Sequence, residues 1–168
     1  MANTYEAIAT VEVGSGGAAS IDFTSIPSTY TDLCLKVSAR TNRGGNPDQM
    51  TIQFNGSTSN YSQKTLEGYN GGTSSYSNTY TFAYVDASGA TSNIFGNAEF
   101  YIPNYAGSSY KSFSIESAVE NNSSAGGEFP AAGLWSDSAG ITSIKLISQV
   151  GATFDQYSTA TLYGIKNS

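Results

Sequence analysis

The amino-acid sequence predicts an all-β protein, an antiparallel two-sheet sandwich with jelly-roll topology, about eight to ten strands and no long helix. Short runs that alternate apolar and polar residues recur along the chain, and such alternation places one face of a strand in a core. Clusters of Gly, Asn, Ser and Pro separate these runs at regular spacing. No segment combines apolar residues three and four apart with helix caps.

The clearest of these runs form a long hairpin over residues 94–119. Its turn, residues 103–109, contains Pro103, Asn104 and Gly107, which are residues that turns favour. We expect this turn to lie at an edge that can touch a neighbouring molecule. The apolar face of the first strand is Ala98, Phe100 and Ile102, and that of the second is Phe113, Ile115, Ser117 and Val119.

The remaining strands follow from the same alternation and from breaks at turn residues. Pro130 and Gly133 interrupt one apolar run, which predicts a short or edge strand at 129–135. Gly151 lies between the last two runs, which predicts that they form a hairpin. Exposed loops are expected at 68–78, 86–93 and 121–128. The other strands are expected at 4–13, 19–23, 31–40, 50–54, 60–67, 79–85, 141–150 and 153–165.

Length and composition favour a single domain over residues 1–168 whose surface is weakly charged. Charged residues make up only 12% of the chain, against about a quarter in ordinary soluble domains. Ser, Thr, Asn, Gly and Tyr must therefore cover the surface, as in an extracellular protein or a component of a particle. The net charge of -6 predicts no nucleic-acid partner, because binding phosphates requires a basic stripe. No apolar run approaches a membrane-spanning helix, and no membrane partner is expected.

Cys34 is the only cysteine, so no disulfide can form within the chain, and we expect a small buried side chain. The N-terminal residues lack the basic and apolar regions of a secretion signal. The sequence thus predicts a protein made inside a cell whose surface suits use outside one.

Most catalytic chemistry is unsupported by the sequence, and we expect no enzyme, no cofactor and no metal site. The chain has no histidine, which removes the commonest general base. Residues 86–91 resemble a calcium loop only faintly, because Asp86 is their single carboxylate. Glu99 and Glu116 face each other in the expected hairpin and are the best candidates for a glycosidase pair. Both lie opposite the apolar face, which favours a solvated or contact surface instead.

Aromatic side chains are the remaining candidates for contacts, either with a glycan or with another subunit. Many tyrosines on a weakly charged sandwich suit both kinds of partner. Trp135 follows an apolar residue and suits a core or interface position better than a sugar platform. The candidate contact residues are Tyr69, Tyr76, Tyr101, Tyr105, Tyr110 and Trp135.

Four segments carry a resemblance to a known group of proteins: NTYEAIATVEVGSGGAASIDFTSIPSTYTDLCLKVSARTNR, FGNAEFYIPNYAGSSYKSFSIESAVENN, AGLWSDSAGITSIKL and FDQYSTATLYGIKNS. Together they resemble small virion-associated proteins of tailed bacteriophages, especially marine ones. Residues 68–93 carry the least of this similarity. The resemblance implies a jelly-roll virion component, either a capsid decoration protein or a module of a tail fibre or tailspike. It brings no catalytic motif.

The leading expectation is therefore a non-enzymatic bacteriophage protein that decorates or cements the capsid. We expect a homo-oligomer, a trimer, bound to other virion proteins such as the major capsid protein and synthesised in the host cytoplasm. One alternative is a carbohydrate-binding receptor module of a tail fibre or tailspike, with a host surface glycan as its partner. A third hypothesis, a depolymerase, requires Glu99 and Glu116 to lie in a cleft.

Overall fold

The computed structural model describes residues 4–122 and 125–166. Within these residues the chain forms 13 strands and no helix, so the all-β class is confirmed. The strand number exceeds the predicted eight to ten. The strands are β1 (Tyr5–Glu12), β2 (Ser20–Phe23), β3 (Asp32–Thr41), β4 (Asp48–Phe54), β5 (Tyr61–Tyr69), β6 (Gly72–Asn78), β7 (Phe82–Ala87), β8 (Gly96–Pro103), β9 (Lys111–Glu120), β10 (Gly126–Glu128), β11 (Ala131–Trp135), β12 (Ile144–Ser148) and β13 (Thr159–Ile165).

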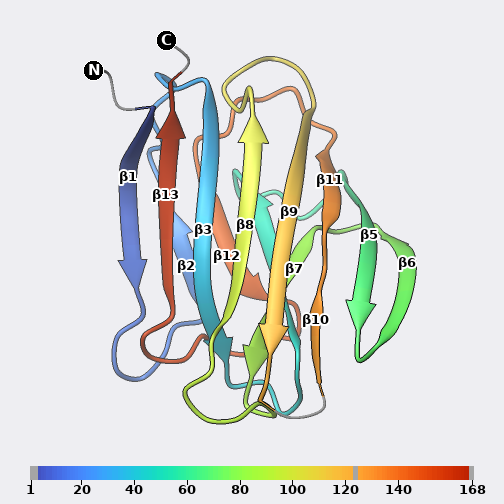
Figure 1. The fold of residues 1–168 in the computed structure, drawn as a ribbon. Helices are drawn as coiled ribbons and strands as arrows, with labels where there is room; N and C mark the ends of the chain where they lie inside the picture. The colour runs from blue at the N-terminus through green and yellow to red at the C-terminus, as the bar shows by residue number, and fades with distance from the viewer. Residues whose placement is uncertain (1–3, 123–124, 167–168) are drawn as a thin grey trace.

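The strands lie in a wide front layer and a narrower back layer (Figure 1). The front layer has the order β1-β13-β3-β8-β9-β11-β5-β6, and β10 pairs with β9 and β5 beside β11. The back layer has the order β2-β12-β4-β7. Every pairing is antiparallel except that of β3 with β7, where Arg40 and Thr41 lie beside Asp86 and Ala87. This short parallel pairing joins both layers into one mixed sheet.

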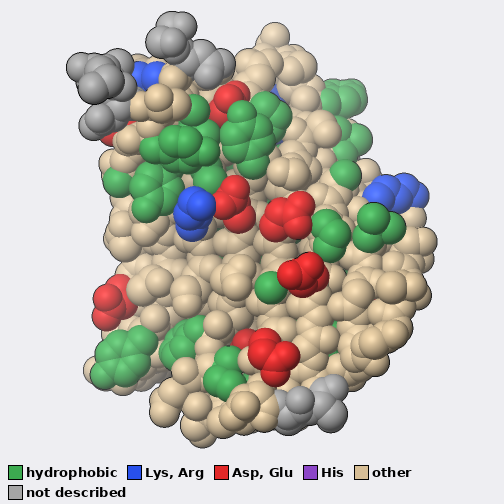
Figure 2. Space-filling model, in the orientation of Figure 1, with side chains coloured by type: hydrophobic (Ala, Val, Ile, Leu, Met, Phe, Trp, Pro, Cys, Tyr) green, Lys and Arg blue, Asp and Glu red, His purple; other side chains and the backbone are tan. Residues whose placement is uncertain are grey.

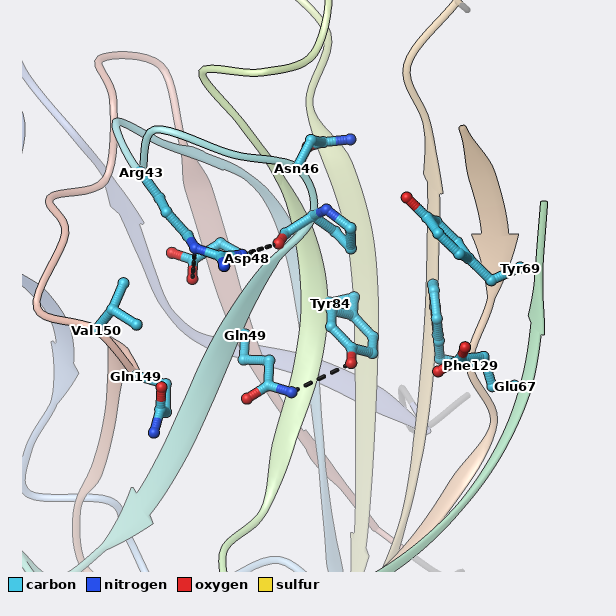
Figure 3. A pocket seen from close by; sticks show the side chains of 11 residues that line it. Arg43, Asn46, Asp48, Gln49, Glu67, Tyr69, Tyr84, Phe129, Gln149 and Val150 are labelled. Atoms are coloured by element: carbon cyan, nitrogen blue, oxygen red, sulfur yellow. Dashed lines mark hydrogen bonds and ion pairs between the residues drawn. The ribbon is translucent and has the colours of Figure 1, made fainter. Parts of the chain in front are cut away.

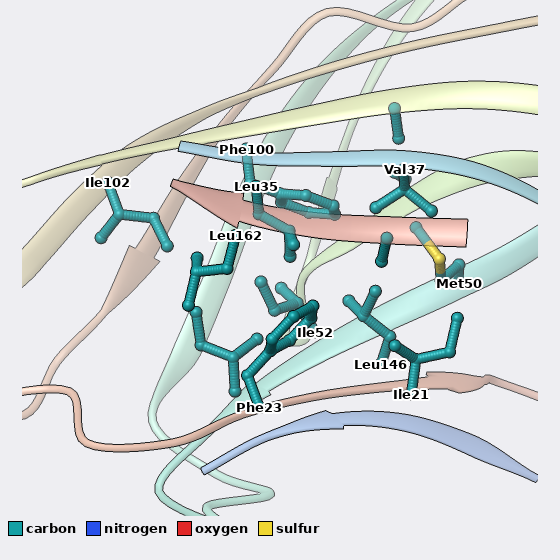
Figure 4. Close-up of a cluster of buried hydrophobic side chains, with 14 of the residues drawn as sticks. Ile21, Phe23, Leu35, Val37, Met50, Ile52, Phe100, Ile102, Leu146 and Leu162 are labelled. Carbon is teal, nitrogen blue, oxygen red and sulfur yellow. The ribbon is translucent and has the colours of Figure 1, made fainter. Parts of the chain in front are cut away.

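The hydrophobic core fills the space between the layers (Figure 4). Leu35 and Leu162 of the front layer are fully buried, as are Met50 and Leu146 of the back layer. The inward faces expected from alternation in β3, β4, β8 and β9 are confirmed, because their apolar residues are buried.

The predicted hairpin is also confirmed as the pair β8 and β9. The buried side chain of Lys111, a residue that is 1% exposed, stabilises the turn of this hairpin. The Lys111 ammonium donates hydrogen bonds to the carbonyl oxygens of Gly107, at 2.8 Å, and of Ser109. Burial lowers the pKa of Lys111, and the two carbonyls compensate for the water that the ammonium has lost.

Two of the segments predicted to be loops contain strands. Residues 68–78 include β6, which pairs with β5 from Gly72 to Asn78, and residues 121–128 include β10. Neither strand carries an apolar face: β6 is exposed or half-buried throughout. Backbone pairing with β5 supports the strand conformation of β6. Alternation of apolar residues cannot predict such a strand, because it reports only strands with a buried face.

The strand predicted at 129–135 is short, as one of the two alternatives expected, but it is not an edge strand. The predicted final hairpin is wrong. β11 lies between β9 and β5, and Pro130 falls in the gap between β10 and β11, where its missing N–H interrupts neither strand. β12 pairs with β2 and β4, whereas β13 pairs with β1 and β3. The chain therefore crosses from the back layer to the front layer after Ser148.

Replacement of Trp135 tests the aromatic part of the core. Its side chain is 1% exposed, and its ring lies 5.6 Å from that of Phe54 and 6.3 Å from that of Tyr61 between centroids. We expect Trp135→Ala to lower the free energy of unfolding by about 3–5 kcal/mol, because it leaves a cavity. Trp135→Phe should cost clearly less, since the indole N–H has no hydrogen-bond partner among the described residues. Chemical denaturation measures both, and equal losses would contradict this role.

Candidate functional site

The six aromatic candidates from the sequence do not form one site. Tyr105 is fully buried and donates its hydroxyl hydrogen to the carbonyl oxygen of Pro27, and Trp135 lies in the core. These two side chains are therefore unavailable as contacts on the folded chain. The choice of Tyr105 as a contact residue is wrong, whereas Trp135 takes the core position that was one of the two expected for it. Tyr110 is 63% exposed and stands alone just before β9. Tyr69 and Tyr76 both lie on the β5–β6 hairpin.

Tyr101 belongs to an aromatic patch on the outer face of the front layer, which we call the tyrosine patch: Tyr5, Tyr101 and Tyr163. Tyr5 packs edge-on against Tyr163, with ring centroids 6.2 Å apart, and Tyr101 donates a 2.8 Å hydrogen bond to Asp32. Figure 2 shows apolar side chains gathered over β1, β13, β3 and β8, with carboxylates beside them. The patch is the main apolar feature of this view.

Cys34 lies beneath this patch, in register between Tyr163 and Tyr101. The predicted buried side chain is confirmed, because Cys34 is fully buried and its thiol is free. Burial raises the pKa of the thiol to about 11, so it is protonated at neutral pH and is a poor nucleophile.

Glu99 and Glu116 are directly opposite each other on β8 and β9, as predicted. Both lie on the outer face, and Glu99 accepts a 2.7 Å hydrogen bond from the ammonium of Lys36. This exposed ion pair contributes little stability. A sheet face with one carboxylate paired to lysine gives the glycosidase hypothesis no support.

The loop that contains residues 86–91 binds the side chain of Arg40 through its backbone carbonyl oxygens. The Arg40 guanidinium donates hydrogen bonds to the carbonyl oxygens of Ala90, Thr91 and Ile94 at 3.0–3.1 Å. Its Nε also lies 3.3 Å from a carboxylate oxygen of Asp155. The Arg40 guanidinium thereby binds the carbonyl oxygens that a metal cation in this loop would need as ligands. Among the described residues no group of three or more His, Cys, Asp or Glu side chains could hold a metal ion.

A second feature, which the sequence did not indicate, is a groove of about 380 Å³ between the back layer and the far end of β5 (Figure 3). We call it the aromatic groove. Gln49 and Tyr84 project into it from β4 and β7, while Glu67 and Tyr69 approach from β5. The remaining lining residues are Arg43, Asn46, Pro47, Asp48, Phe129, Gln149 and Val150.

A row of five aromatic rings runs beneath this groove. The distances between successive ring centroids are 6.0, 4.2, 5.2 and 5.4 Å in the order Tyr69, Phe129, Tyr84, Phe82 and Tyr80. Tyr69, Tyr80 and Tyr84 are half-buried, whereas the two phenylalanines are buried beneath them. The rings come from β5, from the segment before β11, and from β7 and the segment before it, so no local pattern in the sequence predicts the row.

Hydrogen bonds hold the polar side chains of the aromatic groove in place. Gln49 Nε2 donates to the Tyr84 hydroxyl at 3.1 Å, and Gln49 Oε1 accepts from the Tyr80 hydroxyl at 3.0 Å. The hydroxyls of Tyr84 and Tyr76 lie 3.3 Å apart. Burial is the main cause that raises the pKa of Tyr76. Tyr76 thus takes part in the groove's polar network. The sequence indicates Tyr69 and Tyr76 as contact residues but gives no signal for their partners.

No helix in the described part of the chain is long and apolar enough to cross a membrane. Comparison of the chain with protein-family models, with curated proteins and with solved structures gives no significant match.

The buried carboxyl group of Asp86 provides a test of the electrostatics beside β3. Asp86 is fully buried, and neither carboxylate oxygen has a hydrogen-bond partner among the described residues. Burial raises its pKa above the ordinary 3.8, although the neighbouring Asn46 side chain and, after it, attraction to Arg40 oppose the shift. The folded state therefore holds this proton more tightly than the unfolded chain, and stability falls as the pH rises above 3.8.

We expect Asp86→Asn to raise Tm at pH 7, with a gain that shrinks toward pH 4 as the wild-type carboxyl becomes protonated. Thermal melts across this pH range measure the effect. Asp22→Asn is the matched control, because Asp22 is exposed and only 3.4 Å from Lys145 in a surface pair. A wild-type and an Asp86→Asn curve with the same pH dependence would contradict the expectation.

Proposed function

We propose that this chain is a non-enzymatic structural protein of a tailed-bacteriophage particle that decorates the capsid surface. The observation that carries the proposal is the outer face of the front layer, where the tyrosine patch lies beside the carboxylates of Glu99 and Glu116. Interfaces are enriched in tyrosine, whose ring contributes apolar area while its hydroxyl tolerates water. The resemblance of the sequence to virion-associated proteins points the same way.

The strand order supports a jelly-roll topology for the body of the protein. Within the front layer β1-β13-β3-β8 are adjacent, and the back layer reads β2-β12-β4-β7. Along the chain these strands alternate between the layers at every step except from β4 to β7. Such wrapping of antiparallel strands across two layers is typical of jelly rolls. The remaining strands, β5, β6 and β9 to β11, extend the front layer.

The tyrosine patch suits a basic partner surface. Tyr5 is 51% exposed, and Tyr163 and Tyr101 are half-buried beside it. Glu99 and Glu116 adjoin the patch on neighbouring strands, and Lys36 neutralises only one of them directly. We propose that this face binds the major capsid protein and that the chain acts as a trimer. A protein that binds the assembled shell but not the free subunits stabilises the shell by mass action.

Cryo-electron microscopy of the particle tests the location. We expect density for the chain over capsomer junctions, in groups of three copies. Density only on the tail would contradict the decoration proposal.

Addition of purified variants to particles that lack the protein tests the surface. We expect Tyr5→Ser combined with Tyr163→Ser to reduce capsid occupancy at least tenfold, because both rings leave the proposed interface. Tyr110→Ser is the matched control, since it removes an exposed tyrosine outside the patch. Thermal melts establish that the variants remain folded. Equal occupancy for all variants would contradict the role of the tyrosine patch.

The second candidate function is a carbohydrate-binding module of a tail fibre or tailspike, with a host surface glycan as its ligand. The aromatic groove favours it, because ligand sites combine aromatic walls with a few fixed polar groups. Tail-only density in the intact particle would support this candidate over the first.

A further inference from the structure

We propose that the aromatic groove binds an uncharged oligosaccharide of about two or three sugar rings. This goes beyond the structural role proposed for the tyrosine patch, and it supplies the second candidate function with a ligand class and with named residues. The inference rests on that candidate only for its biological setting. The groove's shape, its exposed aromatic surface and its charge each contribute to the argument.

The shape of the groove suits a short chain of linked rings. Its volume of about 380 Å³ falls within the range of sites for small ligands. A neighbouring hollow of about 230 Å³ is lined by Tyr80, Thr51 and Gln53, and Gln149 lines both. Gln49 links the two hollows, because its side chain is hydrogen-bonded to Tyr84, which lines the groove, and to Tyr80, which lines the smaller hollow. The two hollows therefore form one elongated surface over β4 and β7.

The aromatic surface suits the C–H faces of sugar rings. Tyr84 and Tyr69 are half-buried and line the groove, while Phe129 is 3% exposed and packs between them. A buried ring behind two accessible ones keeps the tyrosines from collapsing onto each other. Tyrosine binds apolar surface through its ring and hydrogen-bonds through its hydroxyl, a combination that matches a ring bearing hydroxyl groups.

The polar groups suit sugar hydroxyls, which both donate and accept hydrogen bonds. The amides of Gln49 and Gln149 offer one acceptor oxygen and two donor hydrogens each. Gln49 is already oriented by Tyr84 and Tyr80, so little side-chain entropy is lost when a ligand binds. Gln149 is exposed on the rim, and its backbone N–H donates to the carbonyl oxygen of Gln49 at 2.9 Å.

The charges in the groove favour a ligand without acidic groups. Among the described residues that line it, Arg43 is the only cation, against the two carboxylates of Asp48 and Glu67. The Arg43 guanidinium is already engaged, because it donates to the carbonyl oxygen of Pro47 and lies 3.9 Å from Asp48. A phosphate, sulfate or uronate would therefore meet net negative charge with no cation to receive it.

The test is titration of the full chain with four neutral tetrasaccharides, β-1,4-glucan, β-1,4-N-acetylglucosamine, α-1,4-glucan and α-1,6-mannan, followed by NMR. We expect at least one of them to shift the backbone amides of β4 and β7 with a Kd below 1 mM, a usual scale for small neutral ligands (about 4 kcal/mol). We expect Gln149→Ala and Tyr69→Ala each to weaken this binding about tenfold, close to 1.4 kcal/mol. Tyr110→Ser is the matched control and should bind as the wild type does, because Tyr110 is an exposed tyrosine that lines neither hollow.

Three results would overturn the inference: no shift with any tetrasaccharide at 5 mM (about five times the upper Kd that we expect), shifts confined to residues outside the groove, or equal affinity in the groove variants and the control. A fifth titration uses tetragalacturonate as an anionic comparison, and binding of that ligand alone would be a further contradicting result. Gln149 is exposed, so its replacement tests the site without loss of the fold. The outcome is independent of the particle test, since a capsid position and a sugar-binding groove can each hold or fail alone.

Discussion

Strand β3 is the element on which the rest of the structure depends, because it is the only point at which the two layers pair in the described chain. It pairs along its length with β13 on one side and β8 on the other, and its last two residues pair with β7. The inward residues Leu33, Leu35 and Ala39 are fully buried. Immediately after them, Arg40 binds three carbonyl oxygens of the loop that follows β7. One strand therefore carries both apolar packing and the polar link between the layers.

Before β7 reaches its pairing with β3, side chains rather than another strand cover the edge of the back layer. The backbone N–H of Phe82 donates to Gln63 Oε1 at 2.7 Å, and that of Tyr84 donates to Ser117 Oγ at 3.1 Å. Both acceptors come from the front layer and are themselves buried. This arrangement satisfies donors that would otherwise be buried without partners, or exposed as an edge prone to aggregation. It also brings β5 close to β7, which creates the aromatic groove.

Opposite sides of the molecule therefore carry different chemistry. The tyrosine patch lies on a broad sheet face with Glu99 and Glu116, and a flat face of this kind suits a protein partner. The aromatic groove is concave and has its polar groups fixed by Tyr80 and Tyr84, which suits a small ligand. A particle protein that attaches through one surface leaves the other free, so the two proposals are compatible on one chain.

The sequence by itself determined the all-β class, most strand positions and the inward faces, because alternation directly records which side of a strand is apolar. It also identified the β8–β9 hairpin, whose strands are close along the chain. It could not predict β6, which has no apolar face, or the partners of β12 and β13, which are distant in sequence. The same limit applies to the candidate sites. Tyr105 lies in a predicted turn and was expected at the surface, yet it is fully buried. Gln49, Tyr84 and Phe129 carry no local signal of a site. Only the tertiary structure decided these features, because they depend on which strands lie side by side, and periodicity reports only the face of each strand.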